Sequence, residues 1–538
     1  MADEPIDLSA GVALADIPAD GTLAAQLDGA QLMLARWTDA TGREHVSALD
    51  AICTHSGAKL PTGIRTGDTV HCPFHHACFD LRTGEATVAP AYKPLKRWQA
   101  DIDGDTVHVR DAAPEDEPAL REAADSGTAE SGPLPGTPER VENLRGVERV
   151  VVVGGGAAGF ATVERLRRAA YTGAITLVSG EPHLPIDRTL LSKGYLDGSA
   201  EASKLPLLPD DWYAAHDVDA RIGVHATAID TAERIVTLDS GAEVGYDALV
   251  LATGATPARP ELPGFDRDDA FVLRGQQDAQ AIIAAAQSVA SEAAGSGAKR
   301  VIVVGSGFIG LEVAAAMRTR KVAVTVVSRS ELPLARQLGA DLAGLVKSLH
   351  EEQGVEFVTG SPASWDGAVL ELEDGGTVHG DLIVVGLGVS PNTELAEAAG
   401  LPVTDGVVVD AYGETTVRGV FAAGDIARFP DPVTGRLIRV EHWAQAERAG
   451  ALAAINLLGG QEPLTEPPFF WSKHYSTSLR MAGHAESVED AEVEGSTAEK
   501  SAVVRFTEQG RVTAIAGVGQ DRRVLELEEE LLRQPAGA

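Results

Sequence analysis

The sequence predicts a multidomain protein in which a small all-β domain is followed by a larger α/β region. Short alternating strands separated by turn signals fill about the first 110 residues, which is typical of a small β domain. A buried apolar strand that runs into a glycine-rich turn and a helix begins at Arg149, and the same unit begins again at Val301. The length of 538 residues agrees with several domains, because one domain typically holds about 150 residues.

The N-terminal β domain is expected to span residues 1–110. Residues 39–42 have the composition of a turn, and residues 102–107 read as a hairpin around Asp103-Gly104. From residue 111 to residue 148 the composition changes to Ala, Pro, Glu, Ser and Gly. Such a segment buries too little apolar surface to order itself, so we expect a flexible linker there.

Four metal-ligating side chains stand in two pairs within the β domain. Cys53 and His55 form a C-x-H motif, and Cys72 and His75 form a C-P-x-H motif. In zinc fingers, ligands of the same residue type stand in pairs two to four residues apart, and the histidines lie on a helix. Here each pair instead mixes one Cys with one His. A structural zinc site or a chance grouping remains the alternative interpretation.

The segments around these four residues resemble the two cluster-binding loops of Rieske ferredoxins. In that family two thiolates hold one iron of a [2Fe-2S] cluster and two neutral imidazoles hold the other. The resemblance implies that Cys53, His55, Cys72 and His75 are the cluster ligands. His76 departs from the family, which usually has Gly at that position. We expect it to be an exposed loop histidine, with a hydrogen-bond donor or acid–base group near the cluster as the alternative. The sequence assigns no role to Cys78.

The first strand–turn–helix unit predicts a dinucleotide site. Gly154, Gly156 and Gly159 form a G-x-G-x-x-G motif directly after the strand, where glycines let the backbone and a helix N-terminus approach a pyrophosphate. The next strand ends at Glu181, an acid suited to a ribose hydroxyl pair unless it is a solvated loop residue. The second unit repeats the motif with Gly305, Gly307 and Gly310, so two dinucleotide sites are expected.

Two further segments complete a family resemblance. Residues 246–254 form a strand that ends at Thr253 and Gly254, and residues 416–425 end at Asp425. With the two glycine motifs, they resemble the FAD-dependent pyridine-nucleotide oxidoreductases. The resemblance implies FAD at the first glycine motif, NAD(P)H at the second, and contact between Asp425 and the flavin ribityl chain. The domains it implies are an FAD-binding domain over 149–265 and 381–430, an NAD(P)H-binding domain over 266–380, and an α+β C-terminal domain over 431–538.

Within that family the sequence is similar to one branch. Disulfide reductases carry a Cys pair beside the flavin, but this chain has three cysteines and the last is Cys78. Residues 181–193 instead resemble a segment of oxygenase-type ferredoxin reductases and apoptosis-inducing-factor-like proteins. That resemblance implies that Arg188 and Lys193 lie near the flavin and that Glu312 pairs with Lys193 beside the nicotinamide, where a cation stabilises negative charge on reduced flavin.

The last part of the chain extends this likeness. Residues 440–447 and 467–472 resemble flavin-flanking and C-terminal signatures of the same reductases, which implies that His442 and Trp443 lie close to the flavin. Burial of Trp443 and Trp471 in the core is the alternative. A Rieske domain ahead of such a reductase resembles the apoptosis-inducing-factor-3-like arrangement over nearly the entire chain.

The choice of nicotinamide nucleotide is predicted from the second strand of the NAD(P)H domain. Ser328 stands where NADH users of the family usually have Glu, and Arg329 follows it. An acid there would bind the ribose and repel a 2′-phosphate, whereas Ser328 with Arg329 could accept one. We expect NADPH or dual use, with Glu331 as an alternative ribose ligand.

The sequence therefore predicts an NAD(P)H-dependent electron-transfer flavoprotein. Electrons pass from NAD(P)H through FAD to the chain's own Rieske cluster and on to a protein acceptor such as an oxygenase. The alternatives are an NAD(P)H oxidase and a nucleotide-responsive redox sensor or signalling protein. A net charge of −34 argues against nucleic acid and anionic membranes as partners, although an acidic surface also serves solubility. With no apparent signal peptide, we expect a cytoplasmic monomer or homodimer.

Overall fold

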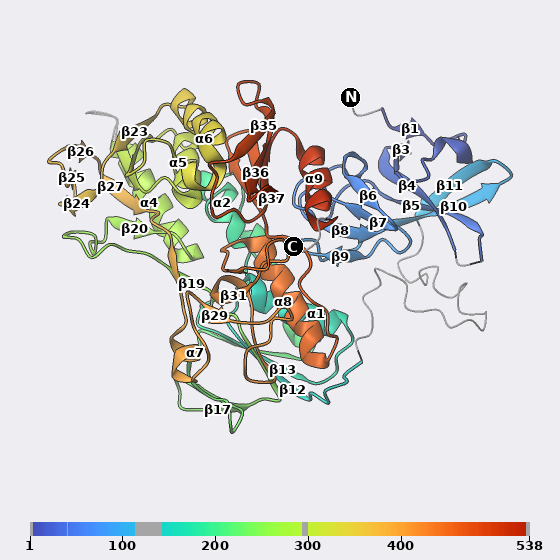
Figure 1. Cartoon of the computed structure of the whole chain (residues 1–538), viewed down its shortest axis with the longest axis horizontal. Coiled ribbons are helices and arrows are strands. Elements are labelled where there is room, and N and C mark those ends of the chain that lie inside the picture. The colour runs from blue at the N-terminus through green and yellow to red at the C-terminus, as the bar shows by residue number, and fades with distance from the viewer. Residues whose placement is uncertain (1–3, 40, 113–141, 293–299, 534–538) are drawn as a thin grey trace. The chain divides into compact units, whose positions relative to one another are not determined.

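The computed structural model describes residues 4–39, 41–112, 142–292 and 300–533 (Figure 1). It divides into two compact units. The first comprises Met1–Val141, Arg168–Tyr171 and Asp521–Glu530, and the second comprises Glu142–Arg167, Thr172–Gln520 and Leu531–Ala538. Most of the predicted linker, residues 113–141, lies outside the described residues.

The first unit is built on two antiparallel sheets, as expected for the all-β domain. The larger sheet has the strand order β1 (Ile6–Asp7), β3 (Leu23–Leu27), β4 (Ala30–Thr38), β5 (Glu44–Asp50), β10 (Arg97–Asp103), β11 (Thr106–Ala112) and β2 (Val12–Ala13), with β1 parallel to β3. The smaller has β6 (Ile64–Thr66), β7 (Thr69–His71), β8 (Cys78–Asp80) and β9 (Ala86–Val88). The predicted hairpin is β10–β11, in which Asp103 pairs with Thr106. Helix η1 spans Leu14–Asp16 and η2 spans Leu60–Thr62.

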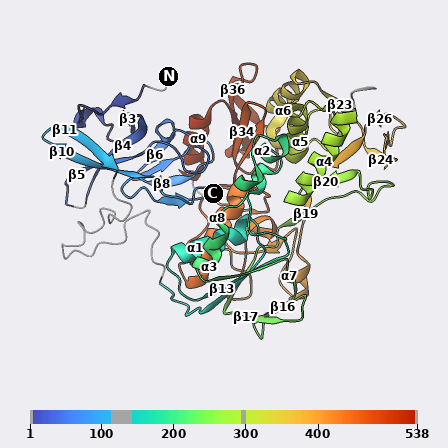
Figure 2. The ribbon, with the colours of Figure 1, turned by 180° about the vertical axis from the view of Figure 1, so that it is seen from behind.

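The second unit begins with a five-stranded parallel sheet. Its order is β14 (Val218–Ile222), β13 (Ala174–Ser179), β12 (Arg149–Val153), β18 (Ala248–Leu251) and β30 (Val420–Ala422). Four of the five residues of β12 are buried, because both faces of a parallel sheet are covered. Figure 2 shows α1 (Ala157–Arg168) and α3 (Asp210–Ala215) beside β13. A meander of β15 (Ala226–Asp230), β16 (Ile235–Leu238) and β17 (Glu243–Gly245) adds to the same core.

A second parallel sheet repeats this architecture. Its order is β20 (Ala270–Val272), β27 (Leu382–Val385), β21 (Arg300–Val304), β22 (Ala323–Ser328) and β23 (Val355–Thr359). Helices α4 (Gln276–Glu292), α5 (Phe308–Thr319) and α6 (Ala335–Glu352) accompany it, together with a meander of β24 (Pro362–Trp365), β25 (Val369–Leu372) and β26 (Thr377–His379). We expected the chain to return to the first domain at residue 381. That boundary is wrong by at least one strand, because β27 pairs with both β20 and β21.

Two short strands, β19 (Ala255–Pro257) and β28 (Val389–Pro391), pair where the chain leaves and re-enters the first domain. The remaining elements of this region are η3 (Arg188–Leu190), α2 (Gly194–Asp197), η4 (Ala202–Lys204), α7 (Glu394–Ala398), β29 (Val407–Val408), η5 (Gly424–Ile426), β31 (Ala427–Pro430), β32 (Leu437–Ile438) and α8 (Trp443–Leu458).

The C-terminal part contains an antiparallel sheet with the order β33 (Phe469–His474), β34 (Thr477–Gly483), β37 (Arg511–Val518), β36 (Ser501–Glu508) and β35 (Ala491–Ser496). Its apolar face packs on α6, through a core that includes Leu342, Val346, Leu479 and Phe506. This packing brings β33 close to α5 and α6. The chain continues into α9 (Asp521–Arg533). Within the described ranges, none of the helices has the length and apolar character needed to cross a membrane.

Candidate functional site

The two loops that carry the predicted cluster ligands have the same backbone conformation. In each, the N–H of the Cys donates to the carbonyl five residues on, and the N–H four residues after the Cys donates back to the Cys carbonyl. The four bonds, 2.8–3.1 Å long, join Cys53 with Ala58, Gly57 with Cys53, Cys72 with Ala77, and His76 with Cys72. The loops therefore present their ligands in equivalent ways.

The side chains of the four predicted ligands meet in pairs. The Nδ1 atoms of His55 and His75 lie 3.1 Å apart, and the Ser56 hydroxyl lies 3.1 Å from His75 Nδ1. The thiols of Cys53 and Cys72 hydrogen-bond to each other, which lowers the pKa of Cys53 to about 7 and, together with burial, raises the pKa of Cys72. Two sulfur and two nitrogen donors are thus available, as a [2Fe-2S] cluster with two ligands on each iron requires.

Backbone N–H groups support both thiolates. Those of His55 and Ser56 lower the pKa of Cys53, and those of Phe74 and His75 lower that of Cys72. Amide donors to ligand sulfurs are one way in which proteins set cluster potential. Among the residues that the structure describes, no group of three or more His, Cys, Asp or Glu side chains is arranged to hold a metal ion.

The expectation that His76 is an exposed loop residue is wrong. Its side chain is buried, with Nδ1 in an ion-pair contact with Glu528, a residue of α9 that belongs to the same compact unit. Its φ of 56° corresponds to the φ of 77° at Gly57 in the other loop. The backbone there is left-handed, which explains why glycine suits this position. Cys78 is also buried, with its sulfur 3.4 Å from His71 Nδ1.

In the second unit, the two predicted glycine loops are built alike. A Cβ on Gly154 would lie 2.0 Å from the Ala252 carbonyl, and one on Gly159 would lie 1.8 Å from the Gly154 carbonyl. The equivalent distances at Gly305 and Gly310 are 2.2 and 2.3 Å, to the carbonyls of Gly386 and Gly305. These four glycines are therefore required for backbone packing.

The middle glycine of each loop has a different environment. A Cβ on Gly156 would meet no atom within 4 Å, and one on Gly307 would come no closer than 3.9 Å to the Gly386 carbonyl. Gly156 stands just before α1, and Gly307 is the residue that precedes α5. The protein thus leaves open space beside each middle glycine, at a helix N-terminus, which suits a pyrophosphate.

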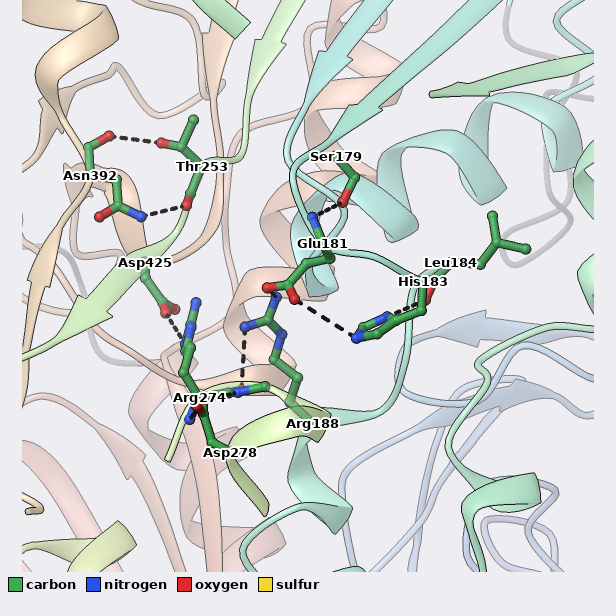
Figure 3. Close-up of polar contacts among 11 residues, drawn as sticks. Ser179, Glu181, His183, Leu184, Arg188, Thr253, Arg274, Asp278, Asn392 and Asp425 are labelled. Atoms are coloured by element: carbon green, nitrogen blue, oxygen red, sulfur yellow. Dashed lines mark hydrogen bonds and ion pairs between the residues drawn. The ribbon is translucent and has the colours of Figure 1, made fainter. Parts of the chain in front are cut away.

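Charged side chains gather at the carboxyl edge of the first sheet (Figure 3). Glu181 follows β13 and accepts a 2.8 Å hydrogen bond from Arg188, while His183 Nε2 lies 3.7 Å from its other oxygen. Asp425, in η5, lies 3.5 Å from Arg274. Burial, followed by the charge of Arg274, lowers the pKa of Arg188. Two arginines lie between two carboxylates, an arrangement that can bind both a diphosphate and ribose hydroxyls.

The Thr253–Gly254 turn lies at the same edge and is held by a reciprocal contact with Asn392. The Thr253 hydroxyl donates to the Asn392 carbonyl at 2.8 Å, and the Asn392 amide donates to the Thr253 carbonyl at 2.9 Å (Figure 3). A Cβ on Gly254 would lie 2.8 Å from Arg274 Nη2. The turn therefore abuts the arginine that faces Asp425.

The N-terminus of α8 lies against η5, which places His442 and Trp443 near Asp425. The His442 ring stacks on Phe470 with centroids 5.0 Å apart, and burial lowers its pKa to about 4. Among the described residues, His442 Nδ1 and the amide of the buried Gln445 have no hydrogen-bond partner within the protein. Buried polar groups are nearly always paired, so these atoms fit a bound group with polar edges, as a flavin ring has.

The expected contact between Lys193 and Glu312 is present, at 2.8 Å. Glu312 is buried on α5 and also accepts hydrogen bonds from the hydroxyls of Ser192, at 2.5 Å, and Ser472, at 2.6 Å. Three donors thus compensate one buried carboxylate, which would otherwise be costly. Ser328 ends β22 and donates to the Ser330 carbonyl at 2.8 Å, while Arg329 and Glu331 are exposed after it.

Comparison with known proteins identifies the family. Residues 148–450 match the protein-family model described as pyridine nucleotide-disulphide oxidoreductase. The chain belongs to this family. Residues 11–99 match the Rieske [2Fe-2S] domain model, and residues 469–534 match the reductase C-terminal model.

Individual relatives agree with this assignment. Human apoptosis-inducing factor 3 is 30% identical over 493 residues, which cover 90% of this chain and 78% of the relative. The ferredoxin–NAD(+) reductase component of a Burkholderia cepacia anthranilate 1,2-dioxygenase system is 37% identical over 381 residues, covering 70% of this chain and 91% of the relative. Among solved structures, the covalent putidaredoxin reductase–putidaredoxin complex matches with 32% identity and a TM-score of 0.66, over 72% of this chain and 93% of that chain.

The protein is accordingly a ferredoxin-reductase-type NAD(P)H oxidoreductase that carries a Rieske domain. Membership of these families implies FAD, NAD(P)H and a [2Fe-2S] cluster, and the donor sets described above fit all three. Sequence reasoning missed three residues of the site, Arg274, Asn392 and Ser472. Arg274 and Asn392 carry no motif. Ser472 lies in the segment 467–472, which was singled out for its resemblance to a reductase signature but without a role for the serine.

Proposed function

We propose that this oxidoreductase passes electrons from NAD(P)H through FAD to its own Rieske cluster and on to a protein acceptor such as an oxygenase. One observation carries the proposal: a single chain combines the ligand set of a [2Fe-2S] cluster with both glycine loops of a reductase. The Burkholderia cepacia relative named as a ferredoxin–NAD(+) reductase component covers 70% of this chain, compared with 90% for human apoptosis-inducing factor 3. A fused Rieske domain would take the place of a separate ferredoxin and act at a high effective concentration.

FAD, when bound, accepts a hydride and releases electrons singly, and the protein orients it. We assign its pyrophosphate to the first glycine loop, at Gly154, Gly156 and Gly159. Glu181 is assigned to the ribose hydroxyls and Arg188 to the phosphates, with Arg274 as a second cation. The remaining assigned contacts are those of Thr253, Gly254, Asp425, His442 and Trp443. The hydrogen bonds and ion contacts that gather these side chains at one sheet edge support the assignment.

NAD(P)H is assigned to the second loop, at Gly305, Gly307 and Gly310. The nicotinamide would lie beside the Lys193–Glu312 pair, since Glu312 is on the helix that this loop begins. Lys193 would stabilise negative charge that develops as hydride arrives. Ser328 and Arg329 would accept a 2′-phosphate, because no carboxylate occupies the end of β22.

An anaerobic titration with NADPH and then NADH tests the relay. Flavin absorbance and the electron paramagnetic resonance signal of the cluster are followed together. We expect flavin bleaching and a Rieske-type signal in the same samples, with the more effective nucleotide settling the coenzyme. Bleaching with a silent cluster would refute the internal route.

The variant His75→Ala, which removes a predicted cluster ligand, provides a second test of the relay. His108→Ala on β11 is the control in the same domain. His75→Ala should abolish reduction of a one-electron protein acceptor and leave flavin-dependent dye reduction intact, whereas His108→Ala should change neither. Persistence of both activities in His75→Ala would contradict the relay. A stoichiometric yield of peroxide that is independent of the cluster would favour an NAD(P)H oxidase or redox sensor instead.

A further inference from the structure

A continuous line of hydrogen-bonded side chains leads away from the Lys193–Glu312 pair. The Ser472 hydroxyl contacts Glu312 Oε1 at 2.6 Å and His474 Nε2 at 3.1 Å. His474 Nδ1 lies 3.1 Å from His350 Nε2. His350 Nδ1 in turn lies 3.2 Å from the Tyr475 hydroxyl. We call these four residues and Glu312 the buried polar chain.

The polarity of the chain follows from its inner end. Oε2 of Glu312 accepts from Lys193 and Ser192, and a carboxylate can only accept, so the Ser472 hydroxyl must donate to Oε1. The Ser472 oxygen then accepts from His474, which requires a proton on its Nε2.

The same reasoning extends to the outer end of the chain. His474 Nδ1 becomes an acceptor, so His350 carries its proton on Nε2 and accepts from the Tyr475 hydroxyl at Nδ1. Every donor in the line therefore points towards Glu312. This is the arrangement in which protons hop inward without any side chain turning.

Burial keeps both imidazoles neutral, as such hopping requires. His350 and His474 are each 0% exposed, whereas Tyr475 is only partly buried and forms the outer end. Burial lowers the pKa of both histidines to about 3, with smaller effects from the charge of His474 on His350 and of Lys193 on His474. A neutral imidazole has one donor and one acceptor nitrogen, and it can pass a proton from one side to the other.

The conformation of Tyr475 is an independent observation. It lies in the turn between β33 and β34 with a φ of 58°, a left-handed conformation that non-glycine residues rarely adopt. Such strain costs about 1–2 kcal/mol, and residues held in this way cluster at functional sites. The turn positions the phenol on His350, at the boundary between the polar chain and solvent.

We propose that the buried polar chain is a proton relay that connects solvent at Tyr475 with the Lys193–Glu312 pair. The inference rests on the proposed function, which places the nicotinamide, and with it the flavin that takes its hydride, beside that pair. Full reduction of FAD by NAD(P)H takes one hydride from the nucleotide and one proton from solvent. The relay supplies this proton: the O–H or N–H bond of each donor breaks as the bond to the next acceptor forms. Solvent replaces the proton that Tyr475 gives up, and Glu312 would pass the proton it receives to the flavin. Reoxidation of the flavin releases protons. One proton that returns outward along the buried polar chain restores the original direction of its hydrogen bonds.

The first test reads the tautomers and does not depend on activity. In protein with ¹⁵N-labelled histidine, nuclear magnetic resonance should find both His350 and His474 neutral and protonated on Nε2 at pH 7. Each signal is assigned from its loss in the corresponding His→Asn variant. Ser472→Ala should release this constraint on His474. Protonation of either ring on Nδ1 in the native protein would overturn the proposal.

The second test follows proton uptake with an indicator dye while NADPH reduces the flavin anaerobically. Uptake and bleaching should coincide in the native protein. Proton uptake should lag behind bleaching in His350→Asn, which keeps a polar side chain but cannot pass a proton. It should also lag in Tyr475→Phe, a milder change at the surface. General acid–base groups contribute about 10²–10⁴-fold, so a delay of about tenfold or more is expected.

Exposed His379 on β26 offers the matched control, His379→Ala, which should behave as the native protein. Added imidazole should restore uptake in His350→Ala. Unchanged coincidence of uptake and bleaching in both relay variants would refute the relay and leave the proposed function standing. Failure of both NADPH and NADH to bleach the native flavin would instead refute the proposed function.

Discussion

Replacing Gly156 by alanine should separate FAD binding from folding. A Cβ at this position meets no protein atom within 4 Å, so the apoprotein should fold normally. The new methyl group would project into the space assigned to the FAD pyrophosphate. Overpacking by such a group typically costs about 1–3 kcal/mol, which corresponds to an increase in the Kd for FAD of about 5- to 150-fold.

The stability of the apoprotein should stay the same or rise slightly. Gly156 does not have a positive φ, and Gly→Ala at a compatible position stabilises by about 0.4–1 kcal/mol through the unfolded state. Fluorescence titration of apoprotein with FAD gives the Kd, and urea unfolding of the apoprotein gives the stability. The two quantities are expected to change independently.

Gly307→Ala is the matched change in the second loop, where the nearest atom to a Cβ is the Gly386 carbonyl at 3.9 Å. It should raise the KM for NADPH by a similar factor and leave FAD binding unaltered. An unchanged Kd for FAD in Gly156→Ala, or an exchange of the two phenotypes, would refute the assignment of the loops.

Three further changes are expected to have distinct effects. Lys193→Met leaves the Glu312 carboxylate buried without a cation and should lower the free energy of unfolding by about 3–5 kcal/mol. The double variant that adds Glu312→Gln should recover this stability. It should not recover the rate of flavin reduction in stopped-flow experiments. Ser328→Glu should lower the ratio of kcat/KM for NADPH to that for NADH by about tenfold or more, a change of about 1.4 kcal/mol, and an unaltered ratio would contradict the assigned 2′-phosphate contact. Because burial lowers the pKa of His350 and His474 to about 3, the unfolded chain binds more protons below about pH 6.5, so stability is lost as the pH falls from there towards 3. His350→Asn should reduce the loss measured by urea unfolding between pH 7 and pH 5 by about 2 kcal/mol.

Features encoded by short segments were predicted well from the sequence. The strands before both glycine motifs, the hairpin at residues 102–107 and the all-β followed by α/β fold class are present in the structure. Each depends on local composition, such as apolar runs or turn residues, which is visible within ten residues of chain.

Features that depend on distant contacts were not predicted. Strand β27 joins the second sheet by pairing with β21, which lies some eighty residues earlier, so no local signal marks the domain boundary. Arg274 becomes part of the site only because the end of β20 comes near Asp425. The buried polar chain likewise combines residues from α5, α6 and β33 through the packing of the C-terminal sheet on α6.

His76 shows how a residue that departs from a family pattern can still keep the family's backbone. The two predicted cluster loops have the same pattern of internal hydrogen bonds, so the backbone at the fifth residue of each loop must be left-handed. Gly57 meets this requirement without strain. A histidine there costs about 1–2 kcal/mol, because its Cβ crowds the following carbonyl. The side chain offsets this cost by becoming buried and contacting Glu528. The left-handed position therefore holds a buried imidazole at the residue that follows His75, a predicted cluster ligand, and not the exposed loop histidine that the sequence led us to expect.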